Sequence, residues 1–360
     1  MEKMKSRLIC GLVVFGAFLW LLSSKGEAAT WNFECGGMVT LQEFINTNVN
    51  SGDTIFVSGT CNENIYIGRG KDNITLDGGG SATINAADAN KHVASVYGRG
   101  ISIKGFTIAG GNAGIDVLAG GTATINNNII GSNIFGIIVG PNSFAVITNN
   151  IIENNSHAGI LITNDSFARI GMEGGVAQPN TIQNNGTHGI TVASSSSATI
   201  VWNTILNNTG MGIWIGDNST AFMGITSPND TVAQPNSIQS NGDGGVMVSQ
   251  SSSTRIVGNT ISNNTGDGVG VFKGSQADIS NNNISGNSGN GIQVSQSSGV
   301  NLGNDTGTTI FDSPNTTTVR NGQKGIICSI GGYGDGRLGT LTGVLGRVSF
   351  ATGCINSLIP

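Results

Sequence analysis

Short stretches in which apolar and polar residues alternate recur along most of this chain. One unit reads ATIVWNTILNNTGMGIWI at residues 198–215, with the patterns A-x-I, N-x-I and, after five or six turn residues, G-I-x-V or a close variant. A period of two residues predicts β-strands, and stretches this short leave no room for a crossover helix. Each unit therefore predicts three short strands joined by bends.

The units repeat with a nearly constant length. In seven of them an asparagine stands nine residues before a glycine, and successive asparagines are 23, 30, 23, 33, 23 and 23 residues apart. These are Asn127, Asn150, Asn180, Asn203, Asn236, Asn259 and Asn282. Two units are thus longer by 7 and 10 residues, and a third insertion is expected around residues 304–315. Because paired strands lie about 4.8 Å apart, stacked units bring identical side chains together in parallel sheets around a core of Ala, Ile and Val.

The repeated asparagines are explained by the bends. Asparagine tolerates left-handed backbone geometry, and its amide both donates and accepts hydrogen bonds, so a stacked column can bond to itself and to the turn backbone. A second column lies five residues further on, at Asn155, Asn185, Asn208, Asn241, Asn264 and Asn287. We therefore interpret the asparagines as a structural ladder.

Other repeat folds fit the pattern less well. A leucine-rich repeat needs several leucines in each unit, but between residues 127 and 297 the only leucines are Leu161 and Leu206. An antiparallel sandwich would not keep one register over seven units. The sequence thus predicts an all-β protein, a right-handed parallel β-helix solenoid with three parallel sheets and about ten coils within residues 73–330.

The two ends of the chain depart from the repeat. Thr40 and Glu43 form a T-x-x-E capping box, which predicts a short capping helix, so residues 29–72 are assigned to an N-terminal cap and the first strands. Residues 331–360 lose the asparagine columns and are assigned to a C-terminal cap. Unpaired strands at the ends of the solenoid could pair with strands of another molecule, and caps would prevent this.

The first residues resemble a targeting signal. Lys3, Lys5 and Arg7 precede an apolar stretch at 8–22, which predicts a signal peptide over residues 1–28. We expect an exported protein, located in the periplasm, at the cell surface or outside the cell, and not an integral membrane protein after processing. An uncleaved N-terminal anchor is the alternative.

Composition and charge limit the classes of partner that this protein is expected to bind. Charged residues make up only 10% of the chain, and there are 57 glycines, yet regularly spaced Ile and Val argue against disorder. Removing the signal leaves 16 − 4 = 12 basic and 21 − 2 = 19 acidic residues, a net charge of −7. Without clustered Lys and Arg we expect no nucleic-acid partner.

Four cysteines remain after removal of the signal. In an oxidising compartment they favour disulfides, and three pairings are open. We favour Cys35 with Cys61 and Cys328 with Cys354, because each pair brackets one end of a long rigid middle. Four reduced, buried thiols are the alternative.

At this point the chain resembles a known superfamily. GDTIFVSGTCNENIYI at 52–67, ITLDGGG at 74–80 and the N-x-I-x-x-N-x-x-x-G-I-x-V coils are similar to the right-handed parallel β-helix proteins of the pectin-lyase-like superfamily, in particular exported bacterial proteins with such repeats. The resemblance covers about residues 35–330 and implies the fold. Its members include lyases, hydrolases, epimerases, phage spikes and proteins of unknown role, so it implies no single function.

Outward positions are where chemistry is expected. The column in G-I-x-V contains Asp116, Ile138, Leu161, Thr191, Trp214, Met247, Gly270, Gln293 and Ile327, and that in A-x-I contains Thr124, Val146, Arg169, Thr199, Phe222, Arg255 and Asp278. Neither column holds the paired groups that acid–base catalysis needs. We expect no cofactor and no metal; Ca²⁺ at the turn carboxylates Asp165 and Asp217 is left open, although hydrated turn residues explain them better.

Six residues are candidates for binding. Ile138, Leu161, Trp214 and Met247 would form an apolar stripe, and we hypothesise that the insertions line a groove in which Trp214 and Phe222 stack on sugar rings. An apolar face covered by protein is the alternative. His157 and His188 fall one position apart in consecutive coils, with Glu153 on the first of these coils. Such a group could bind a metal or move protons, although polar turn residues are the simpler interpretation.

Two functions follow from these observations. The favoured one is a non-catalytic exported scaffold that binds polysaccharide or another cell-envelope component. The alternative is a carbohydrate-active enzyme, a lyase or epimerase of uronate polymers. The missing ionisable cluster favours the first, and whether the protein is an enzyme is left open.

Overall fold

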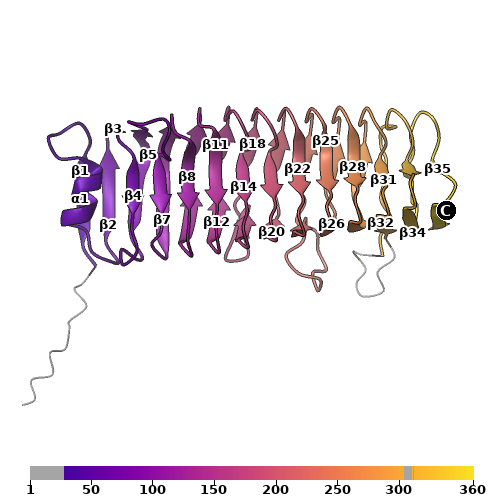
Figure 1. The fold of residues 1–360 in the computed structure, drawn as a ribbon, viewed down its shortest axis with the longest axis horizontal. Coiled ribbons are helices and arrows are strands. Elements are labelled where there is room, and N and C mark those ends of the chain that lie inside the picture. The colour runs from indigo at the N-terminus through magenta and orange to yellow at the C-terminus, as the bar shows by residue number, and fades with distance from the viewer. Residues whose placement is uncertain (1–27, 304–309, 311) are drawn as a thin grey trace, which may run out of the picture.

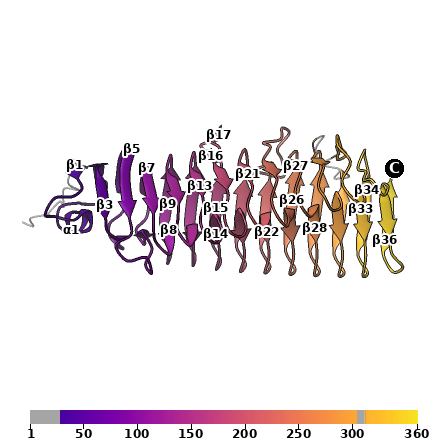
Figure 2. The same cartoon turned by 90° about the horizontal axis from the view of Figure 1, so that it is seen from above.

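The computed structural model describes residues 28–303, 310 and 312–360. The predicted signal peptide lies outside these residues except for Ala28, and so does most of the predicted third insertion. The described chain winds into an elongated solenoid (Figures 1 and 2), an all-β right-handed parallel β-helix of about 14 turns. The prediction of about ten coils was too low, because coils continue on both sides of residues 73–330 within the described part of the chain.

Three ladders of parallel strands form the walls, one for each pattern of the repeat. The first sheet contains β1 (Thr30–Glu34), β2 (Thr54–Ser58), β5 (Thr75–Asn85), β7 (Ile101–Ala109), β9 (Thr122–Asn126), β12 (Phe144–Thr148), β15 (Phe167–Ile170), β20 (Ser197–Ile200), β23 (Thr220–Met223), β26 (Ser253–Val257), β29 (Gln276–Ser280), β32 (Gly299–Leu302), β34 (Tyr333–Arg337) and β36 (Ile355–Ile359). The second sheet contains β3 (Thr60–Asn62), β10 (Ile129–Gly131), β13 (Ile151–Glu153), β18 (Thr181–Gln183), β21 (Thr204–Leu206), β24 (Ser237–Gln239), β27 (Thr260–Ser262) and β30 (Asn283–Ser285). The long strands β5 and β7 pass through the corner between these two sheets and pair in both.

The third sheet is built from the G-I-x-V strands. It contains β4 (Ile65–Ile67), β6 (Ala94–Val96), β8 (Ala113–Val117), β11 (Phe135–Val139), β14 (Ile160–Ile162), β19 (Ile190–Val192), β22 (Met211–Ile215), β25 (Gly244–Val248), β28 (Asp267–Val271), β31 (Ile292–Val294), β33 (Ile326–Cys328) and β35 (Val348–Phe350). In the first insertion, β16 (Met172–Glu173) and β17 (Val176–Ala177) form a small antiparallel hairpin.

The core is the inside of the winding. Ile205, Ile213 and Ile215 of one coil are fully buried, as are their equivalents in the coils on either side. Burying such a side chain contributes roughly 1.5 to 3 kcal/mol, which one isolated coil could not set against the entropy of ordering its backbone. Coils are therefore stable only when stacked.

The asparagine columns lie inside the bends and run along the solenoid. The Asn203 side chain donates to the Ile170 carbonyl at 2.9 Å and to Asn236 Oδ1 at 3.2 Å, and the backbone N–H of Asn203 donates to the same oxygen at 3.0 Å. The column starts at Asn128, so the prediction of Asn127 was wrong by one residue. Asn127 is exposed and takes the left-handed conformation, as do Asn149 and Asn281 just before their column members. The left-handed residue makes the bend, while the next asparagine turns inward.

A third column, which the sequence pattern did not reveal to us, is formed by serines. From the second member on, each serine hydroxyl accepts a hydrogen bond from the backbone N–H of the serine one coil before it. Its members are Ser143, Ser166, Ser196, Ser219, Ser252, Ser275 and Ser298. Buried polar groups in the turn before the first sheet are thus satisfied in the same way as those of the asparagines.

The N-terminal end carries the predicted helix. α1 (Leu41–Thr47) begins at Thr40, whose hydroxyl accepts from the Glu43 N–H at 3.0 Å, and it buries Leu41 and Ile45 completely. A disulfide joins Cys35 to Cys61. α1 lies at the left end of the solenoid in Figure 1.

The C-terminal end differs from its prediction. Residues 331–360 do not form a separate cap; β34, β35 and β36 continue the parallel ladders. Cys328 and Cys354 are free thiols here, so the predicted second disulfide is not formed. Burial and the neighbouring Cys354 thiol raise the pKa of Cys328 to about 12.

Candidate functional site

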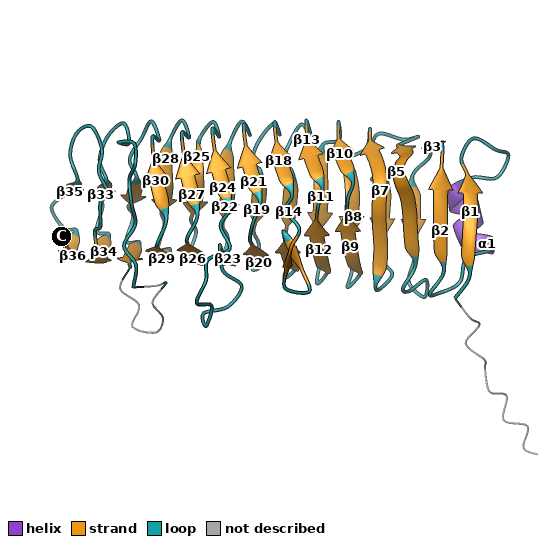
Figure 3. Ribbon diagram, turned by 180° about the vertical axis from the view of Figure 1, so that it is seen from behind, coloured by secondary structure: helices purple, strands orange, loops and turns teal. Residues whose placement is uncertain are grey.

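A groove of about 760 Å³ lies on the outer face of the first sheet. Its floor is formed by the outward side chains of β15, β20, β23, β26 and β29, which stay in register from strand to strand. Met172 and Thr226 reach it from the first two insertions, which project from the same side of the solenoid (Figures 1 and 3). The insertions therefore turn one stretch of an otherwise open sheet face into a groove.

The centre of the floor is made of small side chains between larger ones. Thr199 on β20 lies between Arg169 on β15 and Phe222 on β23, and Ser197 lies beside it on the same strand. Phe222 is half-buried and in register with Arg255 on the next strand. This alternation gives the groove its depth and leaves one aromatic ring in its middle.

Arg169 forms one end of the groove together with two aromatic rings. Phe144 and Phe167 stack with their centroids 5.5 Å apart, and the Arg169 guanidinium lies 5.9 Å from each ring centroid. Contacts of this kind hold a guanidinium in place while its hydrogen-bond donors stay accessible. Arg169 is exposed, so these donors can reach an anionic or hydroxyl-rich ligand.

Arg255 and Asp278 provide the second charged element. Arg255 Nε lies 3.3 Å from Asp278 Oδ2, and both side chains are about one third exposed, at 28% and 36%. Asp278 is the one carboxylate among the residues that line the groove. The ion pair orients both side chains, and the groove stays net positive.

An aromatic side chain continues this surface toward the C-terminus. Tyr333 on β34 crosses over Gly299 on β32, and its hydroxyl donates to Gln276 Oε1 at 2.5 Å. A Cβ atom on Gly299 would lie 2.0 Å from the Tyr333 ring, so the arrangement requires glycine there. Rings at Phe144, Phe222 and Tyr333 are thus distributed along one outer face.

Of the predicted binding residues, only Phe222 lies in this groove. Leu161, Trp214 and Met247 are in register on the third sheet, as the pattern predicted, but this is a different face of the solenoid. The hypothesis that Trp214 and Phe222 line one groove was therefore wrong. Trp214 donates through Nε1 to Ser249 Oγ at 3.0 Å. Its ring packs on Gly216, and a Cβ atom at position 216 would collide with the ring. Residues 214 and 222 fall on consecutive strands separated by a corner, which linear spacing alone did not resolve.

The structure does not combine the two predicted histidines into a site. His188 Nδ1 accepts from the Met211 N–H at 2.9 Å, its ring packs 5.8 Å from that of Trp214, and burial lowers its pKa. The His157 ring packs 5.2 Å from that of Phe135. Glu153 accepts from Gln183 Nε2 at 2.6 Å and brings no third ligand to them. In the part of the chain that the structure describes, no three His, Cys, Asp or Glu side chains gather as metal ligands.

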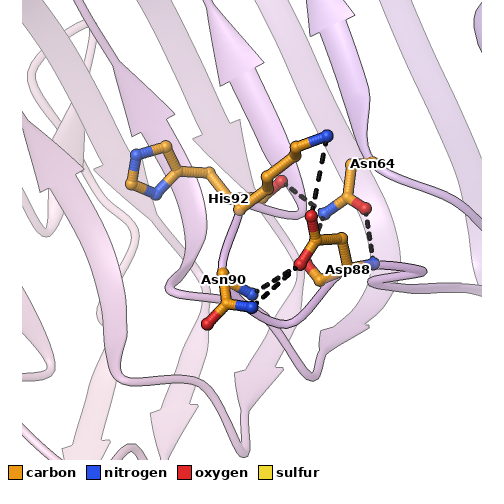
Figure 4. A network of polar contacts seen from close by, with 5 residues as sticks. Asn64, Asp88, Asn90 and His92 are labelled. Atoms are coloured by element: carbon orange, nitrogen blue, oxygen red, sulfur yellow. Dashed lines mark hydrogen bonds and ion pairs between the residues drawn. The ribbon is translucent and has the colours of Figure 1, made fainter.

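One polar cluster was missed by the sequence analysis. The loop before β6 is held by Asn64, whose side chain bonds to Asp88 and to the His92 carbonyl, and Asp88 accepts from Asn90 (Figure 4). This loop places His92 Nε2 3.0 Å from Asp116 Oδ2. Burial raises the pKa of Asp116 to about 7 and lowers the pKa of His92. The histidine is contributed by the coil before Asp116, so spacing within one unit could not reveal the pair.

Sequence-family models agree with this architecture. A model described as right-handed beta helix region matches residues 223–307. Residues 46–224 match a model described as periplasmic copper-binding protein (NosD). Both matches, together with the coils described above, fit a right-handed parallel β-helix protein of the pectin-lyase-like type. The second description names copper binding; among the described residues, no group of three His, Cys, Asp or Glu side chains stands ready to hold a metal ion.

Several solved structures share the fold. The A-module of mannuronan C-5 epimerase AlgE6 from Azotobacter vinelandii is 14% identical, with a TM-score of 0.58, over 86% of this chain and 91% of that one. The periplasmic alginate epimerase AlgG is 15% identical, with a TM-score of 0.54, over 91% and 84%. The catalytic domain of Agl-KA is 16% identical, with a TM-score of 0.50, over 88% and 64%. At these identities the likeness concerns the fold. No curated protein sequence matches the chain.

Among the described residues, no helix is long and apolar enough to cross a membrane.

Proposed function

We propose that this β-helix protein is exported and binds an extended polysaccharide, without turnover, in the groove on the first sheet. The observation that carries the proposal is the groove itself, with Phe222 on a floor of small side chains and Arg169 and Arg255 on either side of it. Ligand sites are concave, largely apolar and supplied with a few fixed polar groups, and this groove has each of these properties.

The dimensions of the surface suit a polymer. Phe144 is on β12 and Tyr333 is on β34, and these two strands are the first and last of eight neighbouring strands. Because neighbouring strands lie about 4.8 Å apart, the two rings are roughly 34 Å apart along the solenoid. Aromatic faces offer apolar area to sugar rings, and guanidinium groups bind carboxylates and hydroxyls through several donors. An extended chain lying along the solenoid would meet all of these groups in turn.

Binding without catalysis fits the ionisable groups better than turnover. Acid–base catalysis needs at least two groups with separated pKa values, but the groove offers one carboxylate that is already paired with Arg255. Export is supported by the predicted signal peptide and by the word periplasmic in the names of the matched family and of AlgG.

The alternative function is a lyase or epimerase of uronate polymers. The Arg255–Asp278 pair favours it, because an arginine could neutralise a uronate carboxylate beside an acidic group. The mannuronan and alginate epimerases share the fold, which makes a uronate polymer the first candidate to assay.

A glycan array tests the proposal. We expect the purified chain to bind a polysaccharide, Phe222→Ala to lose most of that binding, and Trp214→Ala on the third sheet to keep it. Binding lost equally in both variants while their melting temperatures stay unchanged would contradict the assignment to the first sheet. Absorbance of unsaturated uronate products at about 235 nm, followed with the same glycans, separates binding from lyase activity.

A further inference from the structure

A second pocket lies between three successive bends toward the N-terminal end of the solenoid, where Figure 1 labels β4 and β8. The three bends follow the third-sheet strands β4, β6 and β8 and lead to the first sheet. The pocket has a volume of about 340 Å³, and its lining includes Arg69, Asp72, Tyr97 and Arg99. It shares no residue with the groove on the first sheet, so the two sites are separate.

Arg69 is held across the pocket by a long-range hydrogen bond. The residue lies in the first of the three bends, and its Nη2 donates to the Ala119 carbonyl in the third bend at 3.0 Å. Its side chain therefore spans the middle bend, which carries Arg99. A guanidinium has five N–H donors, so the bond to Ala119 leaves others for a ligand. Arg69 is exposed, and a ligand can reach these donors from solvent.

Arg99 brings a second guanidinium to the pocket. Its backbone N–H donates to Asp72 Oδ1 at 2.8 Å, which ties the first two bends together. Its side chain is exposed and has no hydrogen-bond or ion-pair partner among the described residues. Two guanidiniums beside one pocket, one fixed and one without a partner, form a site that suits a carboxylate, because each can donate two parallel N–H bonds to its oxygens.

The pocket also contains an acceptor and an aromatic ring. In the described part of the chain the Asp72 carboxylate forms no ion pair with an arginine, so its oxygens can accept from hydroxyl groups. Tyr97 is partly buried, and its ring packs 5.0 Å from that of Tyr66, which holds it in place. An aromatic ring offers apolar area to the face of a sugar. Two arginines against one aspartate leave the pocket net positive, in a chain whose formal net charge is −5.

We propose that this pocket binds an acidic sugar, with the sugar carboxylate between Arg69 and Arg99 and a sugar hydroxyl donating to Asp72. The arginines favour one negative group, while Asp72 opposes a second one and accepts from hydroxyls. Ligand pockets measure roughly 300 to 1,000 Å³, and this one lies at the lower end of that range, which suits a small ligand better than an extended chain. The site is additional to the polysaccharide groove and does not depend on it.

Saturation-transfer NMR on the purified chain tests the site with D-glucuronate as the probe. We expect D-glucuronate to bind about tenfold or more tightly than D-glucose, which lacks the carboxylate, because a hydrogen bond to a charged group is worth about 1.5 to 3 kcal/mol. Arg99→Met should weaken D-glucuronate binding to a similar extent at an unchanged melting temperature. Arg320→Met is the matched control, since it removes an exposed arginine outside the pocket. Equal binding of the two sugars, or equal binding by Arg99→Met and the wild type, would overturn the proposal.

Asp72→Asn separates an acidic sugar from a simple anion. Asparagine can still accept from the Arg99 N–H, so the bend is kept, but the negative charge is lost. Inorganic phosphate should bind this variant more tightly than the wild type. D-glucuronate should bind it a few-fold more weakly, because a neutral amide oxygen is a weaker acceptor for a hydroxyl group than a carboxylate. Tighter binding of both probes would mean that Asp72 contacts no sugar hydroxyl and would overturn the acidic-sugar assignment.

Phe222→Ala distinguishes this pocket from the groove on the first sheet. Phe222 lines the groove and not the pocket, so the variant should bind D-glucuronate like the wild type. If Phe222→Ala abolished D-glucuronate binding while Arg99→Met kept it, the acidic sugar would bind in the groove. That result would overturn the second site and leave the proposed polysaccharide groove standing.

Discussion

The asparagine columns inside the bends and the groove on the first sheet are built by the same coils, yet they behave in opposite ways. In the columns every coil contributes the same residue with the same hydrogen bonds, whereas in the groove Arg169, Thr199, Phe222 and Arg255 follow one another with no two neighbours alike. Repetition is imposed where coils must satisfy each other's buried groups. Outward positions are free of that constraint, and the proposed binding site lies among them.

The largest expected effect separates the true column from its neighbour. Asn128→Ala would leave the Phe106 N–H and the Ile103 carbonyl without partners in a buried site, which costs about 1 to 3 kcal/mol for each group. We expect the free energy of unfolding to fall by about 4 kcal/mol, measured by chemical denaturation. Asn127→Gly, at the exposed left-handed position one residue earlier, should change it by well under 1 kcal/mol, since glycine accepts this geometry. Similar losses of unfolding free energy in the two variants would contradict the assignment of Asn128, and not Asn127, to the column.

The next effect concerns an outward position that has become buried. The pKa of Asp116 is raised to about 7, so its contribution to stability is fully present below about pH 4, the unfolded value, and is lost as the pH rises through 7. Each pKa unit is worth about 1.4 kcal/mol, so the loss is a few kcal/mol. Asp116→Asn should therefore unfold at a higher temperature than the wild type at pH 8 and show little difference at pH 4. Burial also raises the pKa of Asp267. Asp267 is present in both proteins, so its contribution to stability cancels when they are compared. If the wild type were more stable than Asp116→Asn at pH 8, the Asp116 carboxylate would stabilise the fold at that pH, which contradicts the prediction.

A groove residue should affect binding more than folding. Arg255→Met removes a partly exposed ion pair with Asp278, worth at most about 1 kcal/mol to stability. We expect glycan affinity to fall about tenfold or more, equivalent to ~1.4 kcal/mol, as measured by calorimetry. Arg320→Met, which replaces an exposed arginine outside the groove lining, should bind like the wild type. A variant that loses stability but keeps its affinity would assign Arg255 to the scaffold.

The smallest effect tests the C-terminal part of the binding surface. Gly299→Ala would force the Tyr333 ring off the sheet face, and a side chain that can rotate away costs little stability. Affinity for long glycans should fall a few-fold, while affinity for short glycans that fit the central groove should not change. Equal losses for long and short glycans would contradict a surface that extends to β34.

Patterns within one coil were predictable, while contacts between coils were not. The alternation in residues 198–215 predicted three strands, and the columns through Trp214 and Phe222 stay in register as expected. Asn128 was missed because the coil that precedes Asn150 is 22 residues long, one fewer than the period, and the neighbouring Asn127 kept the spacing apparently intact. The serine column was missed because serine is common in any turn and carries little information by itself.

The sequence by itself determined the winding, because a strand period of two, a coil period of 23 residues and buried asparagines at each bend are compatible with one register only. The tertiary structure decided which outward residues share a face, because a corner of the winding separates Trp214 from Phe222 although they are eight residues apart. It also decided where the insertions fold and how Asp116 meets His92, since those contacts join different coils and depend on the three-dimensional path of each loop.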